Sequence, residues 1–542
     1  MRYSDQAIGG TMIAVKVAIL AILSSLNLFA LGVKALAQEN PKPINYALYF
    51  DSELHDSVEC GMNIKDDKIL IDKRVVNPSM SCPDMFSWKL YVEVILQSWW
   101  SNWASDQQTW PSNPLRLCDK PAKDCCAVNA SDNPGYDNLD APAVNCPYFP
   151  GDHVSAQANE MPRPRPLTKP IGAHAVFLGR GGLGAALEAA PAELEPGRVI
   201  RQEMGEITLR NKEMFNYIFS NDLYNQQGIV KVFERNKFNL THNVPYQAKS
   251  LAGSLSKIDL PISAIMIKSN WIYNEFAKQL GLKDDPQAPY IKKHMTTILN
   301  EGTSEERKYT GEHWLISFHI STKDIPQWVW ATFEHVNNPG RCDFTGCNDS
   351  YGYASPDRIP ADTVNNFTAP HIRNDGLRRS SWIFDLGKPY SSGDISKGLN
   401  DVFRAVGIGT TAQKIQEPRP TDSGWRSYRL KGSQVNFTNA MGRSTRLGNS
   451  VTEGGFMVTS SCITCHARAS VTASGNPENP ISQPLGVFQY DDLSELGYPQ
   501  SAKGIPDKDW FHGNGSNPTL NALQTDFLWG MPFLANPLSG AK

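Results

Sequence analysis

Ser461-Cys462-Ile463-Thr464-Cys465-His466, close to the C-terminus, is the most informative run of this sequence. Two thiols three positions apart lie on one side of a helical turn, where each can add to a vinyl group of one haem. The adjacent His466 would then lie beneath the iron as its proximal ligand. A chain of this composition gives about 0.004 expected chance matches to Cys-x-x-Cys-His. The run therefore predicts one covalently bound haem c.

Two other interpretations of this cysteine pair are weaker. A thioredoxin-like redox pair would need a βαβ context and a preceding Trp-Cys or proline turn, and neither is present. A plain disulfide between Cys462 and Cys465 stays open, but it would not need His466 beside it.

An export signal is predicted at the N-terminus. Basic residues precede an almost uncharged run over residues 17–33, and Ala35-Leu36-Ala37 is a small-x-small site for cleavage before Gln38. Removing residues 1–37 takes away three basic residues and one acidic residue, which changes the formal net charge from −3 to −5. We expect an exported, soluble, periplasmic protein without a membrane span after cleavage. An uncleaved N-terminal membrane anchor is the alternative.

Composition limits the partners. The 542 residues are 40% apolar and 20% charged, which supports two to four packed domains. Basic residues number 52 and acidic residues 55, so the chain lacks the basic balance of a protein that binds phosphate backbones. We therefore expect no nucleic acid partner. A periplasmic electron donor or acceptor fits the haem motif better.

The eight remaining cysteines predict disulfides. An even number in an oxidising compartment is typical of a disulfide framework, here of up to four bonds. Their pairing stays open, because eight cysteines allow 105 connectivities. A metal cluster at Cys118, Cys125 and Cys126 is the weaker alternative, since the spacing lacks paired C-x-x-C knuckles. The eight are Cys60, Cys82, Cys118, Cys125, Cys126, Cys146, Cys342 and Cys347.

Composition and pattern together predict a multidomain chain. We expect an α+β N-terminal and central region, followed by a small, mostly α-helical cytochrome c-like domain. The predicted segments are a signal peptide (1–37), a cysteine-rich N-terminal region (38–150), a Pro/Gly-rich linker (151–200), a mixed α/β central domain (201–440) and the haem domain (441–542).

Periodicity places several elements inside these segments. Apolar residues at helical spacing predict helices within 85–103, 210–224 and 393–406. Alternating or continuous apolar runs predict strands within 260–272, 313–321 and 327–336. Ser450-Val451-Thr452-Glu453 matches a capping box and predicts the start of the helix that carries the first motif cysteine. Gly179–Gly184 fits G-x-G-x-x-G, but prolines follow where a helix should rise, so we expect a glycine loop there.

Four residues of the central region form a second candidate cluster, and they are His313, His319, Glu334 and His335. His313 and His319 lie six positions apart on a predicted strand, so we expect them to share a face. With a carboxylate nearby they could bind a metal or move protons. Histidines held by hydrogen bonds in a purely structural role are the more frequent case.

The second iron ligand is sought downstream of the motif, where only His512 and Met531 are available. Met531 lies 65 residues after His466, flanked by Trp529 and Phe533, which would keep water from the iron. Pro532 should hold Met531 in extended backbone. We therefore predict that Cys462, Cys465, His466 and Met531 bind the haem, with His466 and Met531 on the iron.

Two runs of this sequence resemble a known family. They are Gln327-Trp328-Val329-Trp330-Ala331-Thr332-Phe333-Glu334-His335 and Ser460-Ser461-Cys462-Ile463-Thr464-Cys465-His466-Ala467. Both are similar to stretches of the large, mostly uncharacterised proteobacterial "cytochrome c family" periplasmic proteins, and the second also looks like a monohaem cytochrome c module. The resemblance covers much of residues 200–540. It implies haem and a periplasmic location, and it names no reaction.

Two classes of function follow from these expectations. A protein with one six-coordinate haem would transfer electrons to or from a periplasmic redox partner. The alternative is a haem-dependent oxidoreductase, peroxidase- or oxygenase-like, that acts on a small substrate between the large N-terminal part and the haem domain. In that case His319, Glu334 or His335 would assist.

Overall fold

The computed structural model divides the chain into two compact units, Met1–Tyr46 and Ala47–Lys542. Every residue whose placement is described belongs to the second unit. The predicted signal peptide, the G-x-G-x-x-G run and Cys342 lie outside the described residues. Those described are 56, 59–66, 68–136, 144–154, 204–244, 255–279, 282–299, 304, 306–338, 347–354, 367–368, 394–439, 442, 444–453, 460–483, 489–490, 496–497, 504–513, 515 and 518–540.

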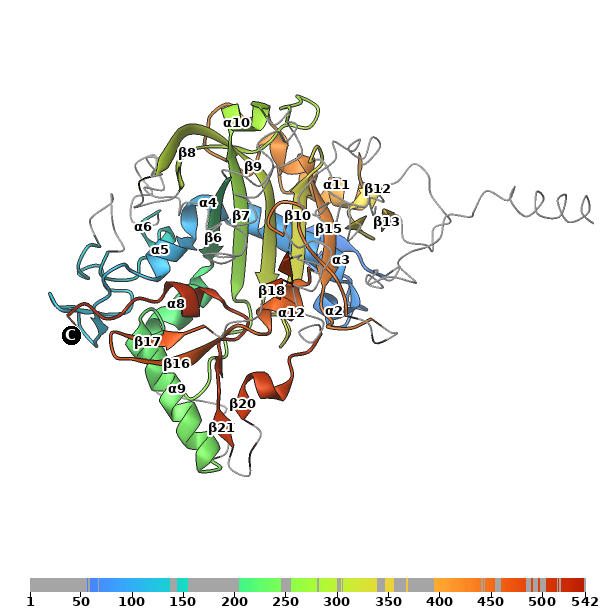
Figure 1. Cartoon of the computed structure of the whole chain (residues 1–542). Coiled ribbons are helices and arrows are strands. Elements are labelled where there is room, and N and C mark those ends of the chain that lie inside the picture. The colour runs from blue at the N-terminus through green and yellow to red at the C-terminus, as the bar shows by residue number, and fades with distance from the viewer. Residues whose placement is uncertain are drawn as a thin grey trace, which may run out of the picture. The chain divides into compact units, whose positions relative to one another are not determined.

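A seven-stranded antiparallel sheet organises the second unit (Figure 1). Its strand order is β15-β10-β9-β7-β6-β3, and β8 pairs with β9 beside this path. The predicted strands within 260–272, 313–321 and 327–336 are confirmed as β7, β9 and β10. The strands are β3 (Ala104–Ser105), β6 (Met204–Arg210), β7 (Ile265–Tyr273), β8 (Lys292–Leu299), β9 (Arg307–Thr322), β10 (Val329–His335) and β15 (Tyr428–Gln434).

One face of this sheet is aromatic and is covered by helix α3 (Pro83–Leu96). Pro83 begins the helix and Asp84 lies in its first turn, both of which favour a helix N-terminus. The ring of Trp88 lies 5.1 Å from that of Phe333, and the centroids of Tyr91 and Phe318 are 5.8 Å apart. Burial of these large side chains makes this layer the main apolar core.

The opposite face of the sheet is polar although it is buried. Lys268 of β7 pairs with His319 of β9, which pairs with Thr332 of β10, so the three residues form one row across the sheet. The next row along contains Asn270 and Glu334. Alternation along each strand places these rows on the side that α3 does not cover. A buried polar face of this kind needs hydrogen-bonding partners from the segment that covers it.

The main core joins residues from the predicted N-terminal, central and C-terminal segments. It includes Met62 and Trp110 of the N-terminal segment, Phe318 of the central segment, and Ile463 and Met531 of the C-terminal segment. The predicted helices within 85–103, 210–224 and 393–406 are confirmed as α3, α8 (Lys212–Ser220) and α11 (Lys397–Ala405). Among the described residues, no helix has both the length and the apolar character needed to cross a membrane.

The prediction of a multidomain chain ending in a small, mostly α-helical domain is wrong. The described part of residues 441–542 contains only short helices, among them α12 (Cys462–His466) and α13 (Gly530–Leu534), and several antiparallel strands. Strands β16 (Ser470–Asn476), β17 (Asn479–Ser482) and β22 (Leu523–Gln524) form a three-stranded sheet. β-branched residues after the motif favour strands, and Gly475, at a φ of 73°, allows the bulge where the pairing of β16 with β17 shifts between Ala473 and Asn476.

The remaining elements are short, apart from α9 beside the C-terminal strands (Figure 1). They are β1 (Met62–Lys65), β2 (Lys68–Ile71), α2 (Pro78–Ser81), α4 (Trp99–Asn102), α5 (Asp106–Thr109), β4 (Arg116–Leu117), β5 (Cys125–Cys126), α6 (Gly151–Val154), α9 (Gln226–Thr241), α10 (Asn274–Gln279), β11 (Cys347–Asn348), β12 (Tyr353–Ala354), β13 (Phe367–Thr368), β14 (Asp394–Ile395), η5 (Ser423–Ser427), β18 (Gln489–Tyr490), β19 (Leu496–Gly497), η8 (Lys508–Trp510), β20 (His512–Gly513) and β21 (Thr519–Leu520).

Candidate functional site

The Cys-x-x-Cys-His run forms a single helical turn, α12. Ser461 caps its N-terminus by accepting a hydrogen bond from the backbone N–H of Thr464 at 3.4 Å. Cys462 and His466 are partly exposed, whereas Ile463 and Thr464 are buried against the protein. Positions i, i+3 and i+4 of a helix share one face, so the two thiols and the imidazole lie on the same side of the turn, where Cys465 is buried and Cys462 and His466 are partly exposed.

Neither motif cysteine is part of a disulfide, and every other described cysteine is disulfide-bonded. The open question of pairing is answered for three bonds, which join Cys60 to Cys82, Cys118 to Cys125 and Cys126 to Cys146. Cys347 is also disulfide-bonded. The prediction of a disulfide framework is confirmed for these seven residues. The alternative of a plain Cys462–Cys465 disulfide and that of a metal cluster at Cys118, Cys125 and Cys126 are not observed.

The imidazole of His466 is oriented by a backbone carbonyl. Its Nδ1 lies 2.8 Å from the carbonyl oxygen of Phe527, an arrangement in which Nδ1–H donates and the lone pair is left on Nε2. Burial lowers the pKa of His466 to about 4, and the charges of Lys268 and His319 add to that shift. The ring is therefore neutral near pH 7, as an iron ligand must be.

A strained turn presents that carbonyl to the histidine. Thr525 to Leu528 form the turn, and the N–H of Leu528 donates to the carbonyl of Thr525 at 3.0 Å. Its two central residues, Asp526 and Phe527, have φ values of 47° and 65°, in the left-handed region that non-glycine residues rarely adopt. Such backbone persists only where its surroundings hold it in place.

The carboxylate of Asp526 supplies those restraints. Its Oδ1 accepts a hydrogen bond from Trp328 Nε1 at 3.2 Å and contacts Lys323 Nζ at 2.5 Å. Its Oδ2 accepts from the backbone N–H of Leu260 at 2.6 Å. Two segments remote in sequence, at Leu260 and at Lys323 and Trp328, therefore fix the turn that orients His466.

The buried amide of Gln434 attaches α12 to strand β15. Its Oε1 accepts the backbone N–H of Ile463 at 2.9 Å, and its Nε2 donates to Ser461 Oγ at 3.0 Å and to Thr445 Oγ1 at 2.7 Å. On the neighbouring strand the ring of Trp330 lies 4.4 Å from that of His466. The motif is thus held on the polar face of the main sheet.

The segment before the motif also binds that face. Glu334, which is fully buried, accepts hydrogen bonds from the backbone N–H and the hydroxyl of Ser450, and its Oε1 lies 3.5 Å from Lys431 Nζ. Asn449 donates from Nδ2 to Thr332 Oγ1 at 3.2 Å. Glu334, one of the residues predicted to bind a metal or move protons, therefore makes structural contacts with Ser450 and Lys431.

His319 and Glu453 form a buried pair next to this segment. His319 Nε2 lies 3.3 Å from Glu453 Oε1, and the buried Nδ1 has no hydrogen-bond partner among the described residues. Burial alone would raise the pKa of Glu453, but the facing His319, with Lys268, lowers it to about 2. The charges of this pair act on His466 as well. The sequence drew attention to His319 but not to Glu453 as its partner.

The predicted helix start at Ser450 is wrong. Residues 450–453 form a turn, in which Asn449 Oδ1 accepts the N–H groups of Val451 and Thr452, and Glu453 Oε2 accepts the N–H of Asn449. The reciprocal cap is therefore present, but it begins one residue earlier. The helix that carries Cys462 is capped separately by Ser461.

The expectation that His313 and His319 share a face is also wrong. The pairing of β7 with β9 shifts between Asn270 and Trp271, and this bulge interrupts the alternation of β9 between the two histidines. His313 instead bonds to Thr297 Oγ1 at 2.8 Å, and burial lowers its pKa to about 4. His335 stacks on Tyr290 with ring centroids 3.6 Å apart. Both act in packing rather than in a shared site.

The two candidates for the second iron ligand lie in different surroundings. Met531 is fully buried in the main core and lies in helical backbone, because Pro532 falls in the first turn of α13, where proline is tolerated. The expectation of extended backbone at Met531 is therefore wrong. His512 is exposed at the start of β20, which pairs with β21.

The residues of α12 have the chemistry that a covalent haem requires. Two thiols outside any disulfide and a neutral imidazole with Nε2 available share one side of the turn, and the rest of the turn is packed against the sheet. Within the described ranges, no group of three or more His, Cys, Asp or Glu side chains is placed to hold a bare metal ion.

No family model, no curated protein and no solved structure matches this chain. The resemblance to the proteobacterial cytochrome c proteins therefore stays a prediction that rests on the residues quoted for it.

Proposed function

We propose that this protein is a periplasmic c-type haem protein, with one haem c attached to Cys462 and Cys465 and its iron bound by His466. The observation that supports the proposal most strongly is the state of the cysteines. Cys462 and Cys465 keep their thiols outside any disulfide on one side of α12, in a chain whose other described cysteines are all disulfide-bonded. The hydrogen bond from His466 to the carbonyl of Phe527 adds to it, because it leaves Nε2 for the iron.

Attachment would need no oxidant or reductant. Each thiol would add across one vinyl group, so that a carbon–sulfur bond forms and the thiol hydrogen passes to the other vinyl carbon. Bound haem supplies a one-electron iron couple. The chain's own residues would then orient the ligand through Phe527 and exclude water from His466 through Trp330, whose ring packs against the imidazole.

Electron transfer with a periplasmic redox partner is the function we propose first. A haem held rigidly on a sheet face suits this role, since Gln434, Ser461 and the 525–528 turn all restrict movement of the axial histidine. The alternative is a haem-dependent oxidoreductase. The buried His319–Glu453 pair favours it, because a histidine with a carboxylate partner can accept or donate a proton near a reacting group.

The test is haem retention through denaturing electrophoresis after expression in a host with c-type maturation. The wild type should give a haem-stained band, and Cys462→Ala with Cys465→Ala should abolish it. Thr464→Ala is the matched control, since it lies between the two cysteines and its buried hydroxyl has no hydrogen-bond partner among the described residues. This variant should keep the stain. A wild-type band without haem would refute the proposal.

Spectroscopy of the purified holoprotein separates the two functions. A low-spin haem that does not react with carbon monoxide supports electron transfer. A high-spin haem that binds carbon monoxide supports the oxidoreductase, and His319→Ala should then reduce turnover while the haem stays attached.

A further inference from the structure

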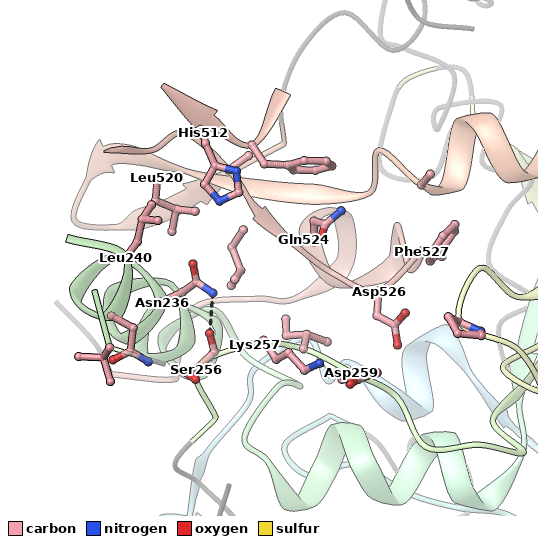
Figure 2. Close-up of a pocket in the computed structure, with 18 of the residues that line it drawn as sticks. Asn236, Leu240, Ser256, Lys257, Asp259, His512, Leu520, Gln524, Asp526 and Phe527 are labelled. Atoms are coloured by element: carbon pink, nitrogen blue, oxygen red, sulfur yellow. Dashed lines mark hydrogen bonds and ion pairs between the residues drawn. The ribbon is translucent and has the colours of Figure 1, made fainter. Parts of the chain in front are cut away.

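A cavity of about 550 Å³ lies beside α12 and shares Asp526 and Phe527 with the turn that orients His466 (Figure 2). Figure 2 shows His512 and Leu520 above one end of it, Asn236 and Leu240 of α9 at the same end, and Phe527 with Asp526 at the opposite end. A volume of this order is typical of sites for small organic molecules.

The cavity lies close to His466. Its wall includes Ala467, the residue after His466, and Phe527, whose carbonyl accepts the His466 hydrogen bond. Cys462, Cys465 and His466 are not among the residues that line it. A molecule in this cavity would therefore touch groups that orient His466 without lying against Cys462, Cys465 or His466.

The charged side chains of the wall are already paired. Lys257 Nζ lies 2.6 Å from a carboxylate oxygen of Asp259, and Lys323 Nζ lies 2.5 Å from Asp526 and 3.4 Å from Asp259. The side chains of Lys257 and Asp259 are exposed, but at the end of the cavity formed by Asp526 a charged ligand would have to compete with the buried Lys323–Asp526 pair or remain unpaired. Both are costly, so the wall selects against net charge.

Uncharged polar groups and apolar side chains make up the rest of the wall. Carboxamides and an imidazole can donate and accept hydrogen bonds, and the apolar side chains offer contact area for a ring. The carboxamides and imidazole are Asn236, Asn239, Asn243, Gln524 and His512. The apolar residues include Leu240, Ile258, Phe511, Leu520, Leu523 and Phe527.

We infer that this cavity binds an uncharged organic molecule with a ring-sized apolar body and one or two hydroxyl or carbonyl groups. Its binding does not depend on haem. A second part of the inference rests on the proposed function. A bound ligand changes the orientation of the His466 imidazole, because the ligand packs on Phe527 and the carbonyl of Phe527 accepts the His466 hydrogen bond.

The test is calorimetric titration of the full chain at pH 7 with four probes that share one ring system. The probes are 2-naphthol, naphthalene, 2-naphthoate and 2-naphthylmethylammonium. We expect 2-naphthol to bind at least roughly tenfold more tightly than either charged probe, and more tightly than naphthalene, which leaves the carboxamides without a partner.

Two variants place the binding in this cavity. Leu520→Trp should fill it and weaken 2-naphthol binding by about tenfold or more. Gln524→Leu replaces an exposed residue and leaves the core intact. It should reduce the difference in affinity between 2-naphthol and naphthalene. Gln107→Leu, an equally exposed glutamine of α5 that does not line the cavity, is the control and should change neither affinity.

The outcomes separate this inference from the proposed function. Equal or tighter binding of a charged probe, no binding of 2-naphthol, or unchanged affinity in Leu520→Trp would overturn the assignment of the cavity. The Cys462→Ala, Cys465→Ala double variant should bind 2-naphthol as the wild type does, so a failure of haem attachment leaves the titration valid. In the holoprotein 2-naphthol should shift the haem absorption band, and a band that stays unchanged at saturation would overturn the coupling to His466.

Discussion

Replacing Gln434 with leucine should loosen the motif while preserving the volume of the side chain. The glutamine is 1% exposed, and its amide makes three hydrogen bonds, to Ile463, Ser461 and Thr445. Leucine can make none of them. The backbone N–H of Ile463 would then be buried in the first turn of α12 without an acceptor, while the hydroxyl of Ser461 still accepts from Thr464.

The expected loss follows from the groups left unsatisfied. A buried donor without a partner costs about 1–3 kcal/mol, and each lost hydrogen bond to a hydroxyl that can rotate elsewhere costs about 0.5–1 kcal/mol. We therefore expect Gln434→Leu to lower the free energy of unfolding by about 2–5 kcal/mol. Gln434→Glu, which keeps an acceptor for Ile463 but loses both donors, should fall between the variant and the wild type.

Urea unfolding followed by tryptophan fluorescence measures the effect. Gln107→Leu, at an exposed glutamine, is the control and should stay within about 0.5 kcal/mol of the wild type. A loss smaller than about 1 kcal/mol in Gln434→Leu would refute the view that this amide fixes the motif to the sheet. An equal loss in the control would show that the assay reports something other than the three bonds.

Three further predictions concern other parts of the chain. Burial above all raises the pKa of Asp349 to about 7, so its ionisation lowers the free energy of unfolding as the pH rises from about 4 through 7. In Asp349→Asn the free energy of unfolding should fall less over this pH range, and urea midpoints measure the difference. Met531→Ala should convert a low-spin haem into a high-spin one that binds carbon monoxide, and an unchanged spectrum would direct the search to His512. Replacing Cys60 and Cys82 with alanine opens a loop of 22 residues and should cost about 3 kcal/mol of unfolding free energy; a loss under about 1 kcal/mol would contradict this.

The spacing of apolar residues was sufficient to predict an element where that spacing follows a single helical or strand period through the segment. Leu399, Val402 and Phe403 lie on one side of α11 and are buried, and the apolar run within 327–336 is β10. The strands rich in polar residues were harder to predict from the sequence. β15 reads Tyr428-Arg429-Leu430-Lys431-Gly432-Ser433-Gln434, and all seven residues are buried because a second layer of polar groups covers them. Tyr428 to Lys431 alternate between apolar and polar residues, but such alternation predicts a solvent-exposed polar face, and Gly432 to Gln434 do not continue it.

The C-terminal part was predicted wrongly because the motif was taken to imply the fold around it. A single turn of helix is enough to place Cys462, Cys465 and His466 on one side, and that turn can be carried by a sheet as well as by a helical bundle. The contacts that hold it come from Gln434 and Phe527, at sequence distances of about 30 and 60 residues from the turn. Contacts at such distances leave no local signal, so the site's support could not be predicted from sequence.

The intact mass of the mature protein tests the haem assignment most directly. The protein would be purified from a periplasm with c-type maturation, denatured, and measured by mass spectrometry without reduction. We predict the mass of the chain plus one haem, with the added mass located by fragmentation on the peptide that contains Cys462 and Cys465. The mass of the bare chain, or a haem on any other peptide, would contradict the account.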